Sequence, residues 1–94
     1  MIVGVPKETA EGERRVALVP ELVPLLTKAG LDIRMEPGAG AAAGFPDASY
    51  QNQKVSLESG VLSKSDIVLK VQPPTLADVP SMKEGAVLIG FLSP

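Results

Sequence analysis

A charged loop near the N-terminus holds residues that could bind an anion. Residues 6–15 follow an apolar run and carry Lys7, Arg14 and Arg15 together with three glutamates. A guanidinium offers two parallel N–H donors to a carboxylate, and each charge-assisted hydrogen bond contributes about 1.5–3 kcal/mol. Loops held by a rigid sheet often carry binding groups, so one interpretation is an anion site. The alternative is a solvated surface loop with offsetting charges, and the spacing alone favours this alternative.

Lys70 is the second candidate, because it is a charged residue within an otherwise apolar segment, residues 67–71. It lies toward the carboxyl end of that segment, where ligands of open α/β sheets bind. Burying an ammonium without a partner is costly, so Lys70 should either meet an anionic ligand or reach solvent at the end of the strand. Glu8, near the end of the first apolar run, is a third option as a purely structural ion-pair partner.

A glycine-rich segment, residues 38–43, formally satisfies the G-x-G-x-x-G/A phosphate-binding pattern and follows a predicted strand. In a working site the third small residue lies in the first turn of a helix whose N-terminus faces the phosphates. Here Gly44, Phe45 and Pro46 interrupt at once. We therefore interpret the segment as a flexible turn and assign no cofactor-binding residue to it.

Composition excludes several classes of function. The net charge is −2 and the nine basic residues are scattered, which argues against nucleic-acid binding. The chain has no cysteine and no histidine, so no zinc site is expected. The longest uncharged stretches are far shorter than the roughly 20 residues that span a bilayer. The N-terminus has no basic region followed by an apolar one, so a cytoplasmic location is expected.

The segments that position the two candidates alternate between strand and helix. This pattern predicts an α/β fold, with a mostly parallel sheet of about four strands and flanking helices. Such a unit corresponds to half of a flavodoxin-like or Rossmann-like domain. An apolar stripe predicts a helix from Pro20 to a stop at Gly30, with Pro24 delaying regular hydrogen bonding. That stripe consists of Leu22, Leu25, Leu26 and Ala29. The predicted strands are residues 1–5, 31–36, 67–71 and 86–92, and residues 55–57 are a weaker candidate for a small fifth strand.

The chain is one domain at most, and we place no boundary within its 94 residues. Fully apolar strands need cover on both faces of a sheet, yet only one strong helix pattern is present. Two weaker helices, one that Asp47 is expected to cap and that runs to about Gln53 and one in residues 58–65, add little. The domain is therefore expected to be incomplete, with its cover supplied by residues beyond Pro94 or by a partner chain.

Several segments together closely resemble the N-terminal signature shared by alanine dehydrogenases and the α subunit of proton-translocating NAD(P) transhydrogenases. The likeness extends over essentially the whole chain. The segments are GVPKE at 4–8, GERRVALVP at 12–20, KAG at 28–30, EPGAG at 36–40, DIVLKVQP at 66–73 and GAVLI at 85–89.

The resemblance implies roles for both candidates. In alanine dehydrogenases the arginine immediately before Val-Ala and the lysine immediately before Val in the later strand hold the substrate carboxylate; these positions match Arg15 and Lys70, whereas Arg14 matches a variable position. The resemblance also implies that residues 38–43 form a family turn, and that the dinucleotide-binding domain follows this segment and is absent from it.

Two departures distinguish the two branches of the family. Alanine dehydrogenases carry a catalytic histidine just after the Phe-Leu that ends the last strand, where this chain has Ser93. Without an imidazole, the usual acid/base partner of the substrate carbonyl is missing, and no catalytic residue is assigned. The pair Gln72 and Pro73 also looks more like the transhydrogenase version.

The leading hypothesis is therefore the N-terminal segment of a transhydrogenase α subunit, inactive alone, with NAD bound mainly by the following domain and NADP on a separate subunit or domain. Its expected partners are the rest of its own polypeptide, a second copy in a homodimer, and the membrane and NADP-binding components at the cytoplasmic face of the inner membrane. The alternatives are an NAD-dependent alanine dehydrogenase and a non-catalytic α/β binding module of flavodoxin topology.

Overall fold

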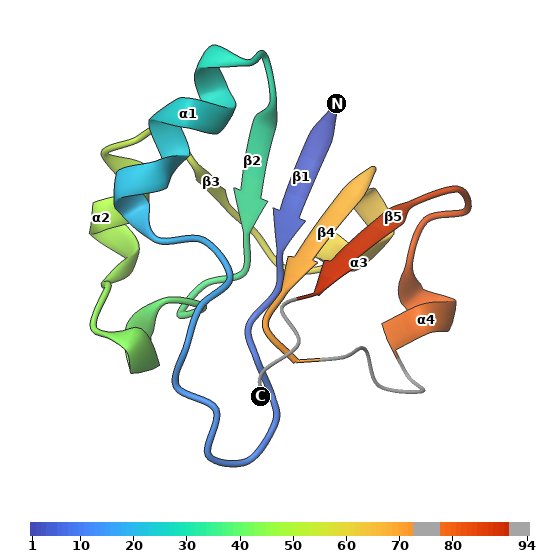
Figure 1. Cartoon of the computed structure of the whole chain (residues 1–94), viewed down its shortest axis with the longest axis horizontal. Helices are drawn as coiled ribbons and strands as arrows, with labels where there is room; N and C mark the ends of the chain where they lie inside the picture. Colours follow the sequence, from blue (N-terminus) through green and yellow to red (C-terminus); the bar gives the residue numbers. More distant parts are fainter. Residues whose placement is uncertain (73–77, 91–94) are drawn as a thin grey trace.

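A computed structural model describes residues 1–72 and 78–90. Within them, one five-stranded parallel sheet has the order β3-β2-β1-β4-β5 (Figure 1). This is the doubly wound order of Rossmann folds and differs from the flavodoxin-like order. The predicted α/β class is confirmed, with five strands in place of about four. The strands are β1 (Ile2–Val5), β2 (Asp32–Met35), β3 (Ser56–Leu57), β4 (Ile67–Lys70) and β5 (Val87–Gly90).

Short helices connect these strands. None of the helices in the described ranges has the length and apolar character needed to cross a membrane. The α-helices are α1 (Val23–Lys28), α2 (Asp47–Gln51), α3 (Val61–Lys64) and α4 (Asp78–Ser81), and the 3-10 helices are η1 (Pro20–Leu22) and η2 (Ala41–Ala43).

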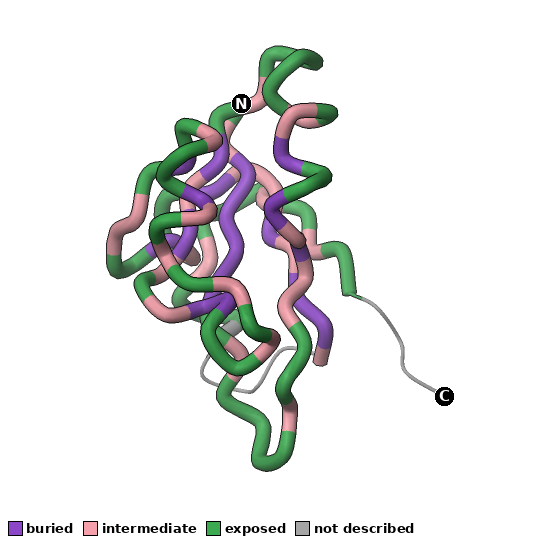
Figure 2. Tube along the Cα trace, turned by 90° about the vertical axis from the view of Figure 1, so that its left-hand side faces the viewer, coloured by how far each residue is buried: buried purple, intermediate pink, exposed green. Residues whose placement is uncertain are grey.

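The main core lies on one face of the β1–β2 half of the sheet. Side chains alternate between faces along a strand, so Val3 and Val5 share a face with their register partners Ile33 and Met35. All four are buried, and helices α1 and α2 pack over them and contribute further buried side chains, Val23 and Tyr50. Figure 2 shows this buried stretch running through the centre of the molecule.

The opposite face of β1 is covered by α3 at very close range. A Cβ atom built on Gly4 would overlap Ser65 Oγ, and Ser65 is itself fully buried. The Ser65 hydroxyl donates a 2.6 Å hydrogen bond to the carbonyl of Val61, so its polar group is satisfied. Glycine at position 4 is therefore required for the end of α3 to pack directly on the central strand.

The β4–β5 half of the sheet has an uncovered apolar face. Ile67 pairs in register with Val3 and with Val87, so these residues lie on the same face as the main core. Helices α1 and α2 do not extend over this half (Figure 1), and Val87 and Ile89 remain 55% and 44% exposed. The sheet therefore lacks full cover within the described residues, in agreement with the expectation from the sequence.

Two local predictions are wrong. The leucine stripe faces the core only in part: Leu22 in η1 and Leu25 in α1 are exposed, whereas Leu26 packs against the core. Val23 is the buried residue of α1. The segment is divided into the 3-10 helix η1 and the six-residue α1, each with a proline in its first turn, so it does not form the one continuous helix that the stripe assumed. Asp47 does not cap α2, because the capping position belongs to Pro46 and the Asp47 carboxylate instead accepts the Gly38 N–H at 2.8 Å.

Candidate functional site

The candidate site lies at the point where the strand order of the parallel sheet reverses. Strands β1 and β4 are neighbours, but β1 leads to β2 on one side and β4 leads to β5 on the other. In open α/β sheets, ligands bind in the crevice outside the carboxyl ends of the strands at such a reversal. Arg15 lies in the loop that follows β1, and Lys70 is the last residue of β4.

Glu8 and Lys70 form a buried ion pair at this reversal point. Lys70 Nζ lies 3.6 Å from Glu8 Oε1, and the two side chains are only 5% and 4% exposed. The same carboxylate also accepts two backbone N–H groups just beyond β4, from Val71 at 2.9 Å and from Gln72 at 3.2 Å. Lys70 therefore does not reach solvent, and the structural partner that the sequence offered as an option is present.

Arg15 is held by a second carboxylate, that of Glu13. Its guanidinium binds both oxygens of Glu13 in a fork, with Nε to Oε2 at 2.9 Å and a terminal nitrogen to Oε1 at 2.7 Å. The Glu13 carboxylate also accepts the backbone N–H of Arg15 at 2.9 Å and the Gln72 side-chain amide at 2.6 Å. Glu13 is 5% exposed, whereas the Arg15 side chain is 53% exposed.

The electrostatics of the loop follow from these contacts. Hydrogen bonds from the Arg15 and Gln72 side chains and from the Arg15 backbone hold the pKa of the Glu13 carboxyl far below its usual range. The same contact with Glu13 raises the pKa of Arg15, and the charge of Glu8 adds to that effect. Glu8 pairs with Lys70, Glu13 pairs with Arg15, and both glutamates contact Gln72, so the two candidate cations belong to one charged cluster at the end of β4.

The loop is thus more ordered than a solvated surface loop with offsetting charges. Two of its three glutamates are nearly buried and tie it to the end of β4. Arg14, by contrast, is exposed. The sequence patterns assigned no contact at the site to Glu13 or Gln72. Only the strand order, which makes β1 and β4 neighbours, brings residue 13 against residue 72.

The glycine-rich segment does not fit a dinucleotide. Its only helical part is the three-residue η2, which is too short to present an N-terminus to phosphates. The space beside Gly40 is filled by the ring of Tyr50, which lies 2.6 Å from where a Cβ atom would be. Residues 38–43 are therefore not assigned to cofactor binding.

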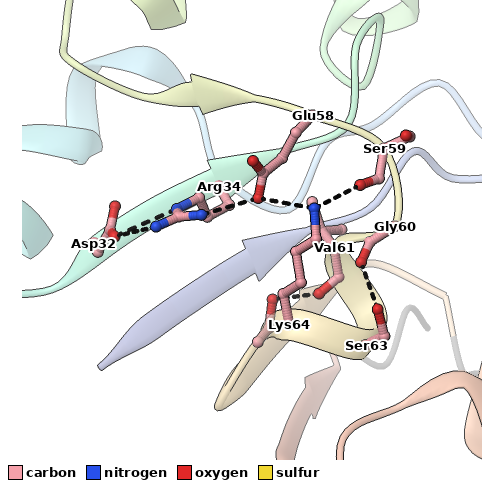
Figure 3. Close-up of polar contacts among 9 residues, drawn as sticks. Asp32, Arg34, Glu58, Ser59, Gly60, Val61, Ser63 and Lys64 are labelled. Atoms are coloured by element: carbon pink, nitrogen blue, oxygen red, sulfur yellow. Dashed lines mark hydrogen bonds and ion pairs between the residues drawn. The ribbon is translucent and has the colours of Figure 1, made fainter.

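A second polar cluster lies along β2, β3 and α3. Arg34 bridges Asp32 at 2.8 Å and Glu58 at 3.0 Å, and Lys64 lies 3.6 Å from Glu58 (Figure 3). These contacts lower the pKa of both carboxyls and raise that of Arg34. Because every member pairs with an opposite charge and is partly exposed, the chain of ion pairs connects β2 to α3 without gathering charge of one sign.

A surface cavity of about 430 Å³ lies beside this region, next to the first turn of α3. Among its described lining residues, Glu36 is the one charged group, and its carboxylate already accepts the Lys7 backbone N–H at 2.8 Å. The cavity does not include Arg15 or Lys70. We therefore place the candidate site at the β1–β4 reversal and not in this cavity.

The family model for the alanine dehydrogenase/PNT N-terminal domain matches residues 4–94. The chain belongs to this family. The alanine dehydrogenase/PNT resemblance inferred from the sequence segments is therefore confirmed, and it extends from the strand β1 to the end of the chain.

Relatives from both branches of the alanine dehydrogenase/PNT family match over nearly the whole chain. The NAD(P) transhydrogenase subunit alpha of Haemophilus influenzae is 39% identical over 98% of this chain. An alanine dehydrogenase of Mycobacterium tuberculosis is 35% identical over the same share. The matches cover 18% and 26% of those proteins, so the chain spans about a fifth to a quarter of their length.

Solved structures agree with the family and the fold. The transhydrogenase from Sinorhizobium meliloti superposes with a TM-score of 0.93 at 31% identity, covering 98% of this chain and 27% of that one. A solved L-alanine dehydrogenase gives a TM-score of 0.88 at 33% identity, covering 96% and 26%. The alanine dehydrogenase/PNT N-terminal fold is therefore shared by proteins of two different oxidoreductase types.

Proposed function

We propose that this chain is the N-terminal segment of the NAD(H)-binding α subunit of a proton-translocating NAD(P) transhydrogenase. The observation that supports this most is the similarity to transhydrogenase alpha subunits, which reaches 37% to 39% identity, against 34% to 35% for the alanine dehydrogenases. The TM-scores, 0.93 and 0.88, lie in the same order.

In the complete enzyme the proposed reaction is NADH + NADP⁺ ⇌ NAD⁺ + NADPH, a hydride transfer between two nicotinamide rings coupled to proton movement across a membrane. Because residues 38–43 do not fit a dinucleotide, NAD(H) is assigned to a following domain and NADP(H) to a separate subunit or domain. This chain then supplies one wall of the cleft, in which Arg15 and Lys70 bind an anionic group of the ligand.

The proposed partners follow from that assignment. They are the rest of the same polypeptide, a second copy of the subunit in a homodimer, and the membrane and NADP-binding components of the complex. The complex would place this segment at the cytoplasmic face of the inner membrane. The exposed apolar face over β4 and β5 supports a close neighbour, since Val87 and Ile89 lie open there.

An NAD-dependent alanine dehydrogenase is the second candidate, favoured by one observation. Arg15 and Lys70 lie in one charged cluster, where two cations could hold the carboxylate of a 2-oxo acid. The reaction would be pyruvate + NH₄⁺ + NADH + H⁺ ⇌ alanine + NAD⁺ + H₂O. Against it stands Ser93, which lies outside the described residues and occupies the position where that reaction needs a histidine.

Assays of the full-length polypeptide that contains this chain separate the two candidates. Membranes carrying all the transhydrogenase components should reduce an acetylpyridine analogue of NAD⁺ with NADPH as donor, and the soluble polypeptide should not oxidise NADH when pyruvate and ammonium are added. Robust pyruvate-dependent oxidation would replace the transhydrogenase proposal with alanine dehydrogenase. If neither activity is detected, the non-catalytic binding module becomes the favoured hypothesis.

The chain on its own tests the assignment of the cofactor to another domain. Titration of the 94-residue chain with NADH to millimolar concentration should show no saturable change in nicotinamide fluorescence. Saturable binding would return the glycine-rich segment to the list of cofactor sites, because it is the part of the chain that resembles a phosphate-binding pattern.

A further inference from the structure

Glu8 makes more contacts at the candidate site than a simple counterion needs. One carboxylate oxygen accepts the Val71 N–H at 2.9 Å, and the other accepts the Gln72 N–H at 3.2 Å. The second oxygen also lies 3.6 Å from Lys70 Nζ. Three consecutive residues at the end of β4 are therefore bound by one side chain from the loop after β1.

Because Glu8 is buried, the loss of any one of these contacts should be costly. Its side chain is 4% exposed, so little water is available to replace a lost partner. A carboxylate only accepts hydrogen bonds, which suits two backbone donors and an ammonium at once. A glutamine in its place would keep one acceptor oxygen but would turn its NH₂ group toward one of the two backbone N–H groups or the Lys70 ammonium. This set of contacts therefore depends on a carboxylate at position 8.

Glu8 also meets the Arg15 pair at Gln72, whose backbone N–H donates to Glu8 and whose side-chain amide donates to Glu13. The loop between Glu8 and Arg15 is fixed a second time at Glu13, which binds both Arg15 and Gln72. The two glutamates thus attach the loop to adjacent residues of the β4 end. Each glutamate is paired with one of the two candidate cations.

We propose that Glu8 is a positioning residue, which holds Lys70 and the Arg15 loop at a fixed separation so that both cations meet one anionic group of the ligand. This inference rests on the proposed binding role of Arg15 and Lys70. Glu8 itself carries a negative charge and does not bind the anion. It acts through Lys70 and through the backbone of Val71 and Gln72.

The direction in which Glu8→Gln changes the anion affinity distinguishes a positioning role from a counterion role. Glu8, Glu13, Arg15 and Lys70 sum to zero charge, so replacing Glu8 by glutamine leaves the cluster with a charge of +1. If Glu8 is only a counterion, the anion is attracted more strongly and its affinity rises. If Glu8 positions the two cations, its removal lets them separate, and the affinity falls despite the favourable change in charge.

The test uses the full-length polypeptide and two small anions, pyruvate and inorganic phosphate, titrated by isothermal calorimetry. The variants are Glu8→Gln and the matched control Glu36→Gln. Glu36 also uses its carboxylate to bind a backbone N–H of the same loop, that of Lys7 at 2.8 Å. Lys70→Met reports whether the anion uses this site at all. Hydrogen exchange measured by mass spectrometry verifies that each variant is folded and follows the Val71 and Gln72 amides.

For Glu8→Gln we expect faster exchange at Val71 and Gln72 and anion affinity about 5- to 30-fold weaker, with Glu36→Gln within about twofold of the wild type. Unchanged or tighter binding by Glu8→Gln, with binding still abolished by Lys70→Met, overturns the positioning role and leaves the proposed anion site intact. Binding that survives Lys70→Met unchanged overturns the anion site, and the positioning role with it.

Discussion

The ring of Tyr50 occupies the space beside Gly40 that any side chain there would need. A Cβ atom on Gly40 would lie 2.6 Å from one ring carbon and 2.7 Å from the phenolic oxygen. The backbone φ of Gly40 is −94°, which other residues also adopt, so the requirement for glycine comes from close packing against Tyr50 and against the Phe45 carbonyl oxygen at 2.9 Å. A glycine that matches a phosphate-binding pattern is therefore explained by packing.

Replacing Gly40 by alanine should destabilise the fold, because the added methyl group must displace a fully buried aromatic ring. We expect the free energy of unfolding to fall by about 1–3 kcal/mol, the usual cost of overpacking a core. Urea unfolding followed by circular dichroism measures it. Gly90→Ala is the matched control, since among the described residues the nearest atom to its Cβ would be the Lys70 carbonyl oxygen at 4.0 Å. Equal stability of the two variants would contradict the packing explanation.

Replacing Tyr50 by phenylalanine should remove one buried hydrogen bond and leave the ring in place. The phenol donates to the Leu18 carbonyl at 2.8 Å, and burial raises the pKa of Tyr50 to about 12. Losing the donor leaves that carbonyl unsatisfied, so we expect unfolding to become easier by about 1–2 kcal/mol in urea titrations at pH 7. A change below about 0.3 kcal/mol would show that water replaces the hydroxyl.

The sequence predicted most of the architecture because the strands carry strong local signals. Residues 1–5, 31–36 and 67–71 are apolar or alternate with period two, and each contains an observed strand. Gly30 was expected to stop the first helix, and its positive φ of 87° fits that role. The buried face of the first helix was predicted wrongly because Pro20 and Pro24 divide the segment into two short helices. The spacing of the leucines does not reveal that division.

The candidate site was harder to predict than the fold. Lys70 was noticeable as a charge in an apolar strand, and Glu8 was already considered as its partner. The Glu13 carboxylate, which binds Arg15 and Gln72, depends on β1 and β4 being neighbours although 59 residues separate Gln72 from Glu13. Contacts of that kind follow from strand order, which residue types along the chain do not specify.

Stability should decline in acid, with Glu13 as a main contributor. Its native pKa lies well below the ordinary value of 4.5, so the native state resists protonation that the unfolded chain accepts. Its stabilising contribution is therefore complete above about pH 4.5 and is lost as the pH falls toward the lowered native pKa. Unfolding in urea at pH 7, 5, 4 and 3 measures this decline.

The matched variants for the acid experiment are Glu13→Gln and Glu11→Gln, two glutamates of the same loop. Glu13→Gln should be less stable at pH 7 and should lose less stability between pH 5 and 3 than the wild type. Glu11 is exposed, so Glu11→Gln should follow the wild-type curve. Parallel curves for Glu13→Gln and the wild type would assign the acid sensitivity to other carboxyls with lowered pKa, namely Asp32, Glu58 and Asp66.

Replacing Arg15 by alanine in the full-length polypeptide should weaken anion binding by about 10- to 100-fold, the size of one or two charge-assisted contacts. Calorimetric titration with pyruvate and inorganic phosphate measures it. Arg14→Ala is the control, because Arg14 is an exposed arginine on the same loop and carries the same charge. If both variants lose affinity equally, the loop attracts anions only by its net charge and Arg15 holds no particular position.

The strand order, which places β4 and β5 on the opposite side of β1 from β2 and β3, also affects how the purified chain behaves. Helices α1 and α2 cover one face of the sheet at β1 and β2, whereas α3 packs on the other face. The side chains of Val87 and Ile89 on β5 therefore remain exposed to solvent. Two molecules can hide them by stacking these faces together. Concentrated preparations of the chain alone should therefore self-associate, and a lysine at position 87 or 89 is the simplest change that would keep it monodisperse.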